Sequence, residues 1–189
     1  RNGSLSKSAL KRKKWYNHHM GTTFFVGLIG SLVLVTGAAW QDKKVTCPTN
    51  SIKNWLFAIG GLLMLIYAFL NYQEGGPIFF FILELLVLAA SVLMMVDTND
   101  RVDTTVIGVA GAALVVWSLS LFEGYNTVIF ILGLTGIGLG YAFDMGTIRR
   151  NMALFVGSAL IALFSYLETS WIFFWLNVFF ALFSFYYVL

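Results

Sequence analysis

Seven long apolar segments, separated by short polar connections, constrain this chain more than any other feature. Each has 17 to 20 residues, close to the roughly 20 residues with which an α-helix crosses a hydrocarbon core about 30 Å thick. The segments are residues 22–40, 55–71, 77–96, 104–122, 125–143, 151–167 and 171–189. None alternates with the period of a barrel strand, so helices are the way to satisfy the backbone in lipid. The sequence therefore predicts an all-α, polytopic transmembrane helix bundle with about seven spans.

The composition leaves little material for a soluble domain. Hydrophobic residues make up 59% of the chain and charged residues 11%, against about 45–50% and about 25% in ordinary soluble domains. A globule of 189 residues cannot hide that much apolar surface. We therefore expect a basic tail at residues 1–20, a single transmembrane domain at residues 21–189, and the lipid bilayer as the main contact.

Three short turns that each carry one Glu suggest an internal repeat. Glu74, Glu123 and Glu168 follow one another at spacings of 49 and 45 residues, each between two apolar segments. This spacing is typical of a repeated helical hairpin in a membrane protein. The predicted hairpins cover residues 55–96, 104–143 and 151–189, after one N-terminal helix.

The basic residues divide evenly between the tail and alternate connections. Six of the twelve lie in the tail, six lie in the first, third and fifth connections, and the Glu-bearing turns have none. Seven spans would place the two sets on opposite faces of the membrane. If the first segment did not cross, six spans would leave all twelve on one face, as the positive-inside rule favours. Because the first segment is long and apolar enough to cross, seven spans with the tail inside is the favoured prediction.

The basic cluster of the tail directly precedes an aromatic residue. Lys11, Arg12, Lys13 and Lys14 are followed by Trp15, and such a group suits the headgroup region of an anionic leaflet, where each cation contributes about 1 kcal/mol. We predict a membrane-surface anchor here. Binding of nucleic acid is not expected, because a folded basic module is absent from the sequence.

The composition of the tail is compatible with two different membrane locations. No acidic residue precedes Asp42, while Ser, Lys and Arg are frequent. This bias is found in the trailing part of organellar transit sequences and equally in a basic cytoplasmic tail. We expect an integral, multi-pass membrane protein, in a bacterial inner membrane or an organellar membrane.

Glu84 is the one ionisable residue placed clearly inside an apolar segment. A charge in mid-membrane costs about 2.5–3.5 kcal/mol on insertion scales, so such residues usually have a role. Glu84 follows Glu74 by 10 residues, Gly133 follows Glu123 by 10 and Asn177 follows Glu168 by 9. Equivalent repeat positions would place Glu84 and Asn177 side by side across a gap of glycine size. Two interpretations stay open: a proton or cation site, and a structural hydrogen bond between helices worth about 1 kcal/mol.

Small and hydroxyl residues in the segments indicate close helix packing. Gly133, Gly136 and Gly140 form a ridge that would let a neighbouring helix approach. Hydroxyl side chains such as those of Thr36 and Ser165 are expected to bond carbonyls of their own helix.

The sequence contains no signature of catalysis. It has no Gly-x-Ser-x-Gly elbow, no His-Glu-x-x-His, no His within an apolar segment and no pair of Asp within one segment. We therefore do not expect an enzyme.

Two glycine-containing stretches resemble the HdeD-like short-repeat membrane proteins. They are Phe57-Ala58-Ile59-Gly60-Gly61-Leu62-Leu63-Met64 and Leu154-Phe155-Val156-Gly157-Ser158-Ala159-Leu160-Ile161. The resemblance implies a bundle of helical hairpins and a link to acid stress. It differs from the family pattern of six spans and hairpin turns with Pro, because a seventh segment is present and only Pro77 lies in a hairpin turn. It therefore transfers no functional residue.

The scarcity of buried polar groups and the aromatic content of 17% favour a structural or accessory subunit of a larger membrane assembly. Its partners would be other membrane subunits or further copies of the chain. The alternative is a small proton- or ion-linked transporter or channel that uses Glu84.

Overall fold

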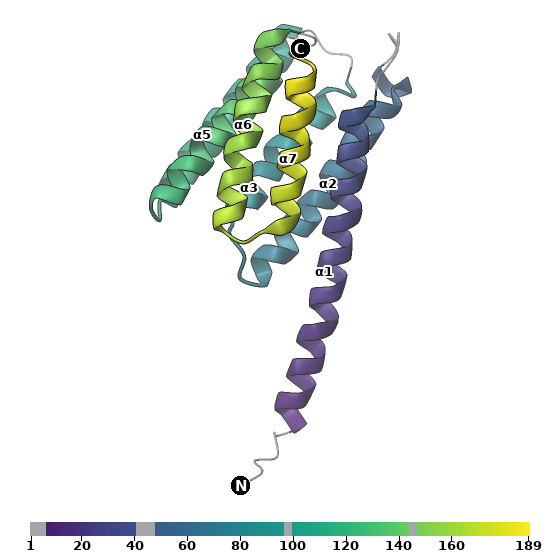
Figure 1. Cartoon of the computed structure of the whole chain (residues 1–189), viewed down its shortest axis with the longest axis vertical. Helices are drawn as coiled ribbons and strands as arrows, with labels where there is room; N and C mark the ends of the chain where they lie inside the picture. Colours follow the sequence, from purple (N-terminus) through teal and green to yellow (C-terminus); the bar gives the residue numbers. More distant parts are fainter. Residues whose placement is uncertain (1–6, 41–47, 97–99, 144–146) are drawn as a thin grey trace.

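The computed structural model describes residues 7–40, 48–96, 100–143 and 147–189. Within these ranges the chain forms seven α-helices and one short 3-10 helix, and no strand (Figure 1). The elements are α1 (Lys7–Ala39), η1 (Pro48–Asn50), α2 (Ile52–Gln73), α3 (Phe79–Leu93), α4 (Asp100–Ser120), α5 (Tyr125–Ala142), α6 (Ile148–Leu167) and α7 (Trp171–Tyr186). The prediction of an all-α helix bundle is confirmed. The side chains of the predicted surface anchor, Lys11 to Trp15, lie outside the described part of the chain.

Five of the seven helices are long and apolar enough to cross a membrane: α1 from Gly21 to Ala39, α2, α4 from Arg101 onward, α5 and α6. The chain is thus a multi-pass membrane protein. Helices α3 and α7 have 15 and 16 residues, or about 22–24 Å at 1.5 Å per residue, so the predicted spans 77–96 and 171–189 were too long. Apolar residues continue at both places, but α3 begins only after Pro77 and ends in a turn at Met94, while α7 ends in a turn at Tyr187.

Helix α3 occupies the centre of the bundle. Each helix packs against the next one along the chain, and α7 packs against α1, which closes the arrangement. Helix α3 also contacts α5 and lies behind α6 and α7 in Figure 1. Nine of its fifteen residues are buried. The most extensive contacts join α5 to α6 and α1 to α2, which are pairs outside the predicted hairpins, so the hairpin repeat stays a prediction.

The two ends of the bundle differ in charge. One end, called here the Glu-turn face, carries Glu74, Glu123 and Glu168 in the turns after α2, α4 and α6. The other end, called here the Arg face, carries Arg149 and Arg150 at the start of α6, and Arg101 together with Asp100 and Asp103 at the start of α4.

Two of the Glu-bearing turns end their helices in the same way. After Glu74, the Gly76 amide donates to the Asn71 carbonyl at 2.9 Å; after Glu168, the Ser170 amide donates to the Ser165 carbonyl at 2.8 Å. Both are Schellman motifs, which require a positive φ at the residue after the cap. Gly75 adopts it without strain at φ 96°, whereas the β-branched Thr169 adopts it at φ 55°. The third turn differs, because Gly124 (φ 147°) caps the start of α5.

The predicted glycine ridge lies where α5 meets α6. A Cβ atom placed on Gly136 would lie 2.8 Å from the Gly157 Cα, and one on Gly140 would lie 2.5 Å from the Leu154 side chain. Gly133 faces Ile161 in the same way. Backbone therefore meets backbone at Gly136, and a larger residue there has no flexible neighbour to displace.

Hydroxyl side chains within the helices mostly bond their own backbone, as predicted. Thr36 donates to Leu32 O at 2.7 Å and Ser165 to Ile161 O at 2.7 Å. Hydrogen bonds between helices lie instead near the ends of the bundle, for example from Asn54 to the Met94 carbonyl at 2.8 Å. The interior is therefore held mainly by apolar packing.

We predict that Gly136→Ala destabilises the purified protein by about 1–3 kcal/mol, because the added methyl group meets backbone. Gly108→Ala on α4 is the matched control. A Cβ atom at Gly108 meets nothing within 4 Å, so its effect should stay within about 0.5 kcal/mol. Thermal unfolding in mild detergent measures both, and equal effects would contradict the close α5–α6 contact.

Candidate intramembrane carboxyl site

Glu84 lies near the middle of the central helix, with 1% of its surface exposed. It follows the first residue of α3 by five positions, or about 8 Å along the helix axis. Its Oε2 atom is buried and has no hydrogen-bond partner among the described residues. Since nearly all buried polar atoms in proteins find a partner, this atom requires an explanation.

Glu84 lines a small cavity between five helices. The cavity has a volume of about 30 Å³, and about 10–15 Å³ suffices for one water molecule. Its polar wall consists of Glu84 from α3, Tyr141 from α5, Ser158 from α6 and Asn177 from α7. The apolar wall consists of Leu34, Leu83, Val87, Ile137, Leu154, Leu176 and Phe180. The space suits a proton with one or two waters, or a small ion.

The structure brings Glu84 and Asn177 into one cavity wall, but Oε2 of Glu84 does not bond to the amide. The Asn177 side-chain nitrogen donates to the Phe173 carbonyl of its own helix at 2.9 Å. The third repeat position, Gly133, packs against Ile161 and does not line this cavity. A structural hydrogen bond between helices therefore does not explain why the Oε2 atom of Glu84 is buried.

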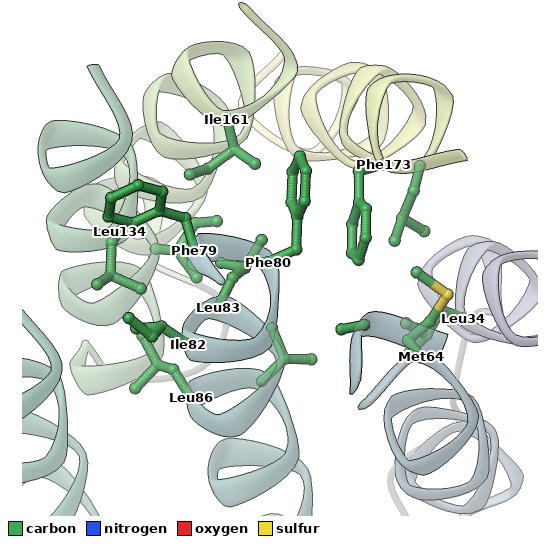
Figure 2. Close-up of a cluster of buried hydrophobic side chains, with 14 of the residues drawn as sticks. Leu34, Met64, Phe79, Phe80, Ile82, Leu83, Leu86, Leu134, Ile161 and Phe173 are labelled. Atoms are coloured by element: carbon green, nitrogen blue, oxygen red, sulfur yellow. The ribbon is translucent and has the colours of Figure 1, made fainter. Parts of the chain in front are cut away.

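A layer of buried aromatic rings separates this cavity from the Glu-turn face. Phe79 and Phe80 of α3 meet Phe130 of α5, Phe164 of α6 and Phe173 of α7, and all five are at most 4% exposed. The Phe80 and Phe173 rings stack with centroids 4.1 Å apart and an interplanar angle of 2°; Figure 2 shows the two rings between α3 and α7. On each of the four helices the aromatic residue is nearer the Glu-turn face than the residues that line the cavity.

The three Glu-bearing turns converge beyond the aromatic layer. Glu74, Glu123 and Glu168 line one open depression, with a volume of about 670 Å³, whose floor includes Phe79. Two of the carboxylates are bonded: Thr23 donates to Glu74 at 2.7 Å and Asn126 donates to Glu168 at 2.9 Å. The described residues contain no group of three or more His, Cys, Asp or Glu that could hold a metal ion. The depression therefore gives the face an acidic surface without a built metal site.

A second cavity lies on the opposite side of Glu84 from the aromatic layer. It has a volume of about 70 Å³ and opens between α3, α4, α5 and α6 near the Arg face. Its polar wall includes Asp103, Thr104, Tyr141 and Arg150. Tyr141 thus lines both cavities.

Sequence reasoning found two of the four polar residues at the carboxyl site. It missed Tyr141 and Ser158, because a Tyr near a helix end usually marks the membrane interface and a Ser beside Gly usually marks packing. Only the packing of α5 and α6 with α3 brings both residues into the wall of the cavity at Glu84.

We predict that Glu84→Leu stabilises the folded protein by about 1–3 kcal/mol, because it removes a buried polar atom that lacks a partner. Glu84→Gln is the control, since it keeps the size and polarity of the side chain and should gain less. Thermal unfolding in detergent compares both with the parent. A less stable Glu84→Leu protein would show that the carboxyl has a structural role.

No known protein-family model, curated protein or solved structure matches this chain. The resemblance to HdeD-like proteins therefore stays a prediction, and the function is inferred from the site alone.

Proposed function

We propose that this multi-pass membrane protein is a small proton- or cation-linked transporter or channel in which Glu84 binds the ion. The observation that carries the proposal is the fully buried Oε2 atom of Glu84, without a partner in the described chain, at a cavity of water size. A polar atom retained there lowers stability, so a role in binding explains its presence better than packing does.

The surroundings of Glu84 support an ion as the ligand. Asn177, Ser158 and Tyr141 offer oxygen atoms around a space of about 30 Å³, which excludes organic solutes. Ionisable residues that face the interior of a bundle commonly mark ion or proton pathways. The acidic depression on the Glu-turn face would raise the local concentration of cations outside the aromatic layer.

The aromatic layer is consistent with a closed state. Five packed rings lie between the acidic depression and the cavity of Glu84. An ion from the Glu-turn face could pass only if these rings moved apart, as hydrophobic constrictions do when they open.

We predict that proteoliposomes containing the parent protein carry protons, Na⁺ or K⁺ down an imposed gradient, whereas Glu84→Gln vesicles show the rate of empty vesicles. An entrapped pH dye reports protons, and radioactive tracers report the two metal ions. The matched control is the isosteric substitution Thr36→Val, which removes an exposed hydroxyl that donates to Leu32 O of its own helix and should retain transport. Equal rates for the parent and Glu84→Gln would refute the proposal.

A second candidate function, an accessory subunit, is favoured by helix α4. Only 11% of its span is buried, against 33% in each of the other four spans. Of its two glycines, Gly108 meets nothing within 4 Å and Gly111 only one atom of Leu86 at 4.0 Å. The glycines at the α5–α6 contact, by contrast, touch a neighbouring helix closely. This face is thus suited to a transmembrane helix of another subunit.

We predict for this candidate that native mass spectrometry of the protein, extracted gently from its own membrane, finds a stoichiometric partner subunit. Gly108→Leu should release that partner without unfolding the chain, because the added side chain points into open space. A lone monomer, or a partner that stays bound to Gly108→Leu, would count against docking through α4.

A further inference from the structure

Tyr141 is the residue shared by the walls of two cavities, one at Glu84 and one near the Arg face. It lies near the end of α5 and contributes to the wall of the cavity at Glu84 and to that of the cavity at Arg150. A Tyr hydroxyl can donate and accept a hydrogen bond at the same time. It can therefore link water in one cavity to water in the other.

In the opposite direction, the described residues offer no comparable link. Between Glu84 and the Glu-turn face lie Phe79, Phe80, Phe130, Phe164 and Phe173, none of which carries a polar side-chain atom. A chain of hydrogen bonds cannot cross that layer while the rings stay packed. Access to Glu84 is thus one-sided in this structure.

We propose that the ion held by Glu84 is a proton, which it exchanges with the Arg face only, through Tyr141. This inference rests on the proposed function and specifies its ligand and its route. In each transfer the Tyr141 oxygen accepts a proton from water beside Glu84 and releases its own proton to water in the second cavity. The tyrosine ends unchanged, and the net result is one proton moved from Glu84 to the Arg face.

The charges around Glu84 favour a proton over a divalent metal ion. Tyr141 is the other titratable side chain in the wall of its cavity, and the nearest cavity beyond it holds Asp103 and Arg150. A metal ion bound there would find one carboxylate and neutral oxygens, whereas divalent ions prefer several charged oxygen ligands. A proton needs only the carboxyl itself, and it leaves this buried site uncharged.

Infrared spectroscopy of the full-length protein in lipid tests this route. The carbonyl band of a protonated carboxyl, identified by its absence in Glu84→Gln, shifts when the acid proton is replaced by deuterium. We expect Tyr141→Phe to slow this exchange in D₂O on the order of tenfold or more. The substitution keeps the ring, so the fold is retained.

The matched control is Tyr67→Phe, which removes the hydroxyl of a buried Tyr beside Phe173, with ring centroids 5.3 Å apart, on the sealed side. Its exchange rate should equal that of the parent. Exchange as fast in Tyr141→Phe as in the parent, or slowed only in Tyr67→Phe, would overturn the route. Absence of any Glu84-dependent carbonyl band would overturn the claim that Glu84 holds a proton. Glu84→Gln can abolish transport in vesicles even if the exchange results overturn the route or the missing band overturns the proton. In that case the proposed function stands and this inference alone fails.

Discussion

The stacking of Phe80 on Phe173, with ring centroids 4.1 Å apart, holds the central helix against α7, and the environment of Glu84 depends on it. Phe79 adds contacts to Phe130 and Phe164 at 5.0 and 5.7 Å. Because lipid gives no hydrophobic force between helices, such packing must supply much of the association. It buries the short helix α3 on nearly all sides and carries Glu84 into the interior with it.

Close packing of α5 against α6, and of α1 against α2, leaves space for α3 at the centre of the bundle. Glycines at the α5–α6 contact let two backbones meet, and glycines such as Gly30 and Gly60 do the same between α1 and α2. The two close pairs lie on different sides of α3, which fills the space between them together with α7. The interior formed in this way is mostly apolar. The buried carboxyl of Glu84 is unusual within it, since nearly every other polar group bonds its own helix or lies near an end.

Much of this architecture could be predicted from the sequence because lipid imposes simple rules. Apolar length predicted all seven helices, and glycine spacing predicted the ridge at α5. The lengths were less accurate: segments 55–71 and 151–167, at 17 residues each, belong to helices of 22 and 20 residues, whereas α3 and α7 proved shorter than expected. Hydropathy reports which residues tolerate lipid, while caps and turns decide where a helix ends.

The candidate site was only half visible in the sequence. Glu84 could be identified because an ionisable residue in an apolar segment is costly to insert into a membrane. Asn177 could be identified because it follows its Glu-bearing turn at nearly the same spacing as Glu84. Tyr141 and Ser158 carried no such signal, because their role depends on which face of α5 and α6 meets α3. The strained backbone of Thr169 could not be predicted either, since the sequence reveals neither its φ of 55° nor the helix cap that imposes this angle.

The most direct test of this account is a structure of the protein in lipid at a resolution that reveals ordered water. We predict a water molecule bonded to Oε2 of Glu84 in the cavity shared with Asn177 and Tyr141, with the five aromatic rings closed toward the Glu-turn face. A Glu84 carboxyl bonded directly through both oxygens to protein groups, in a filled interior, would contradict it.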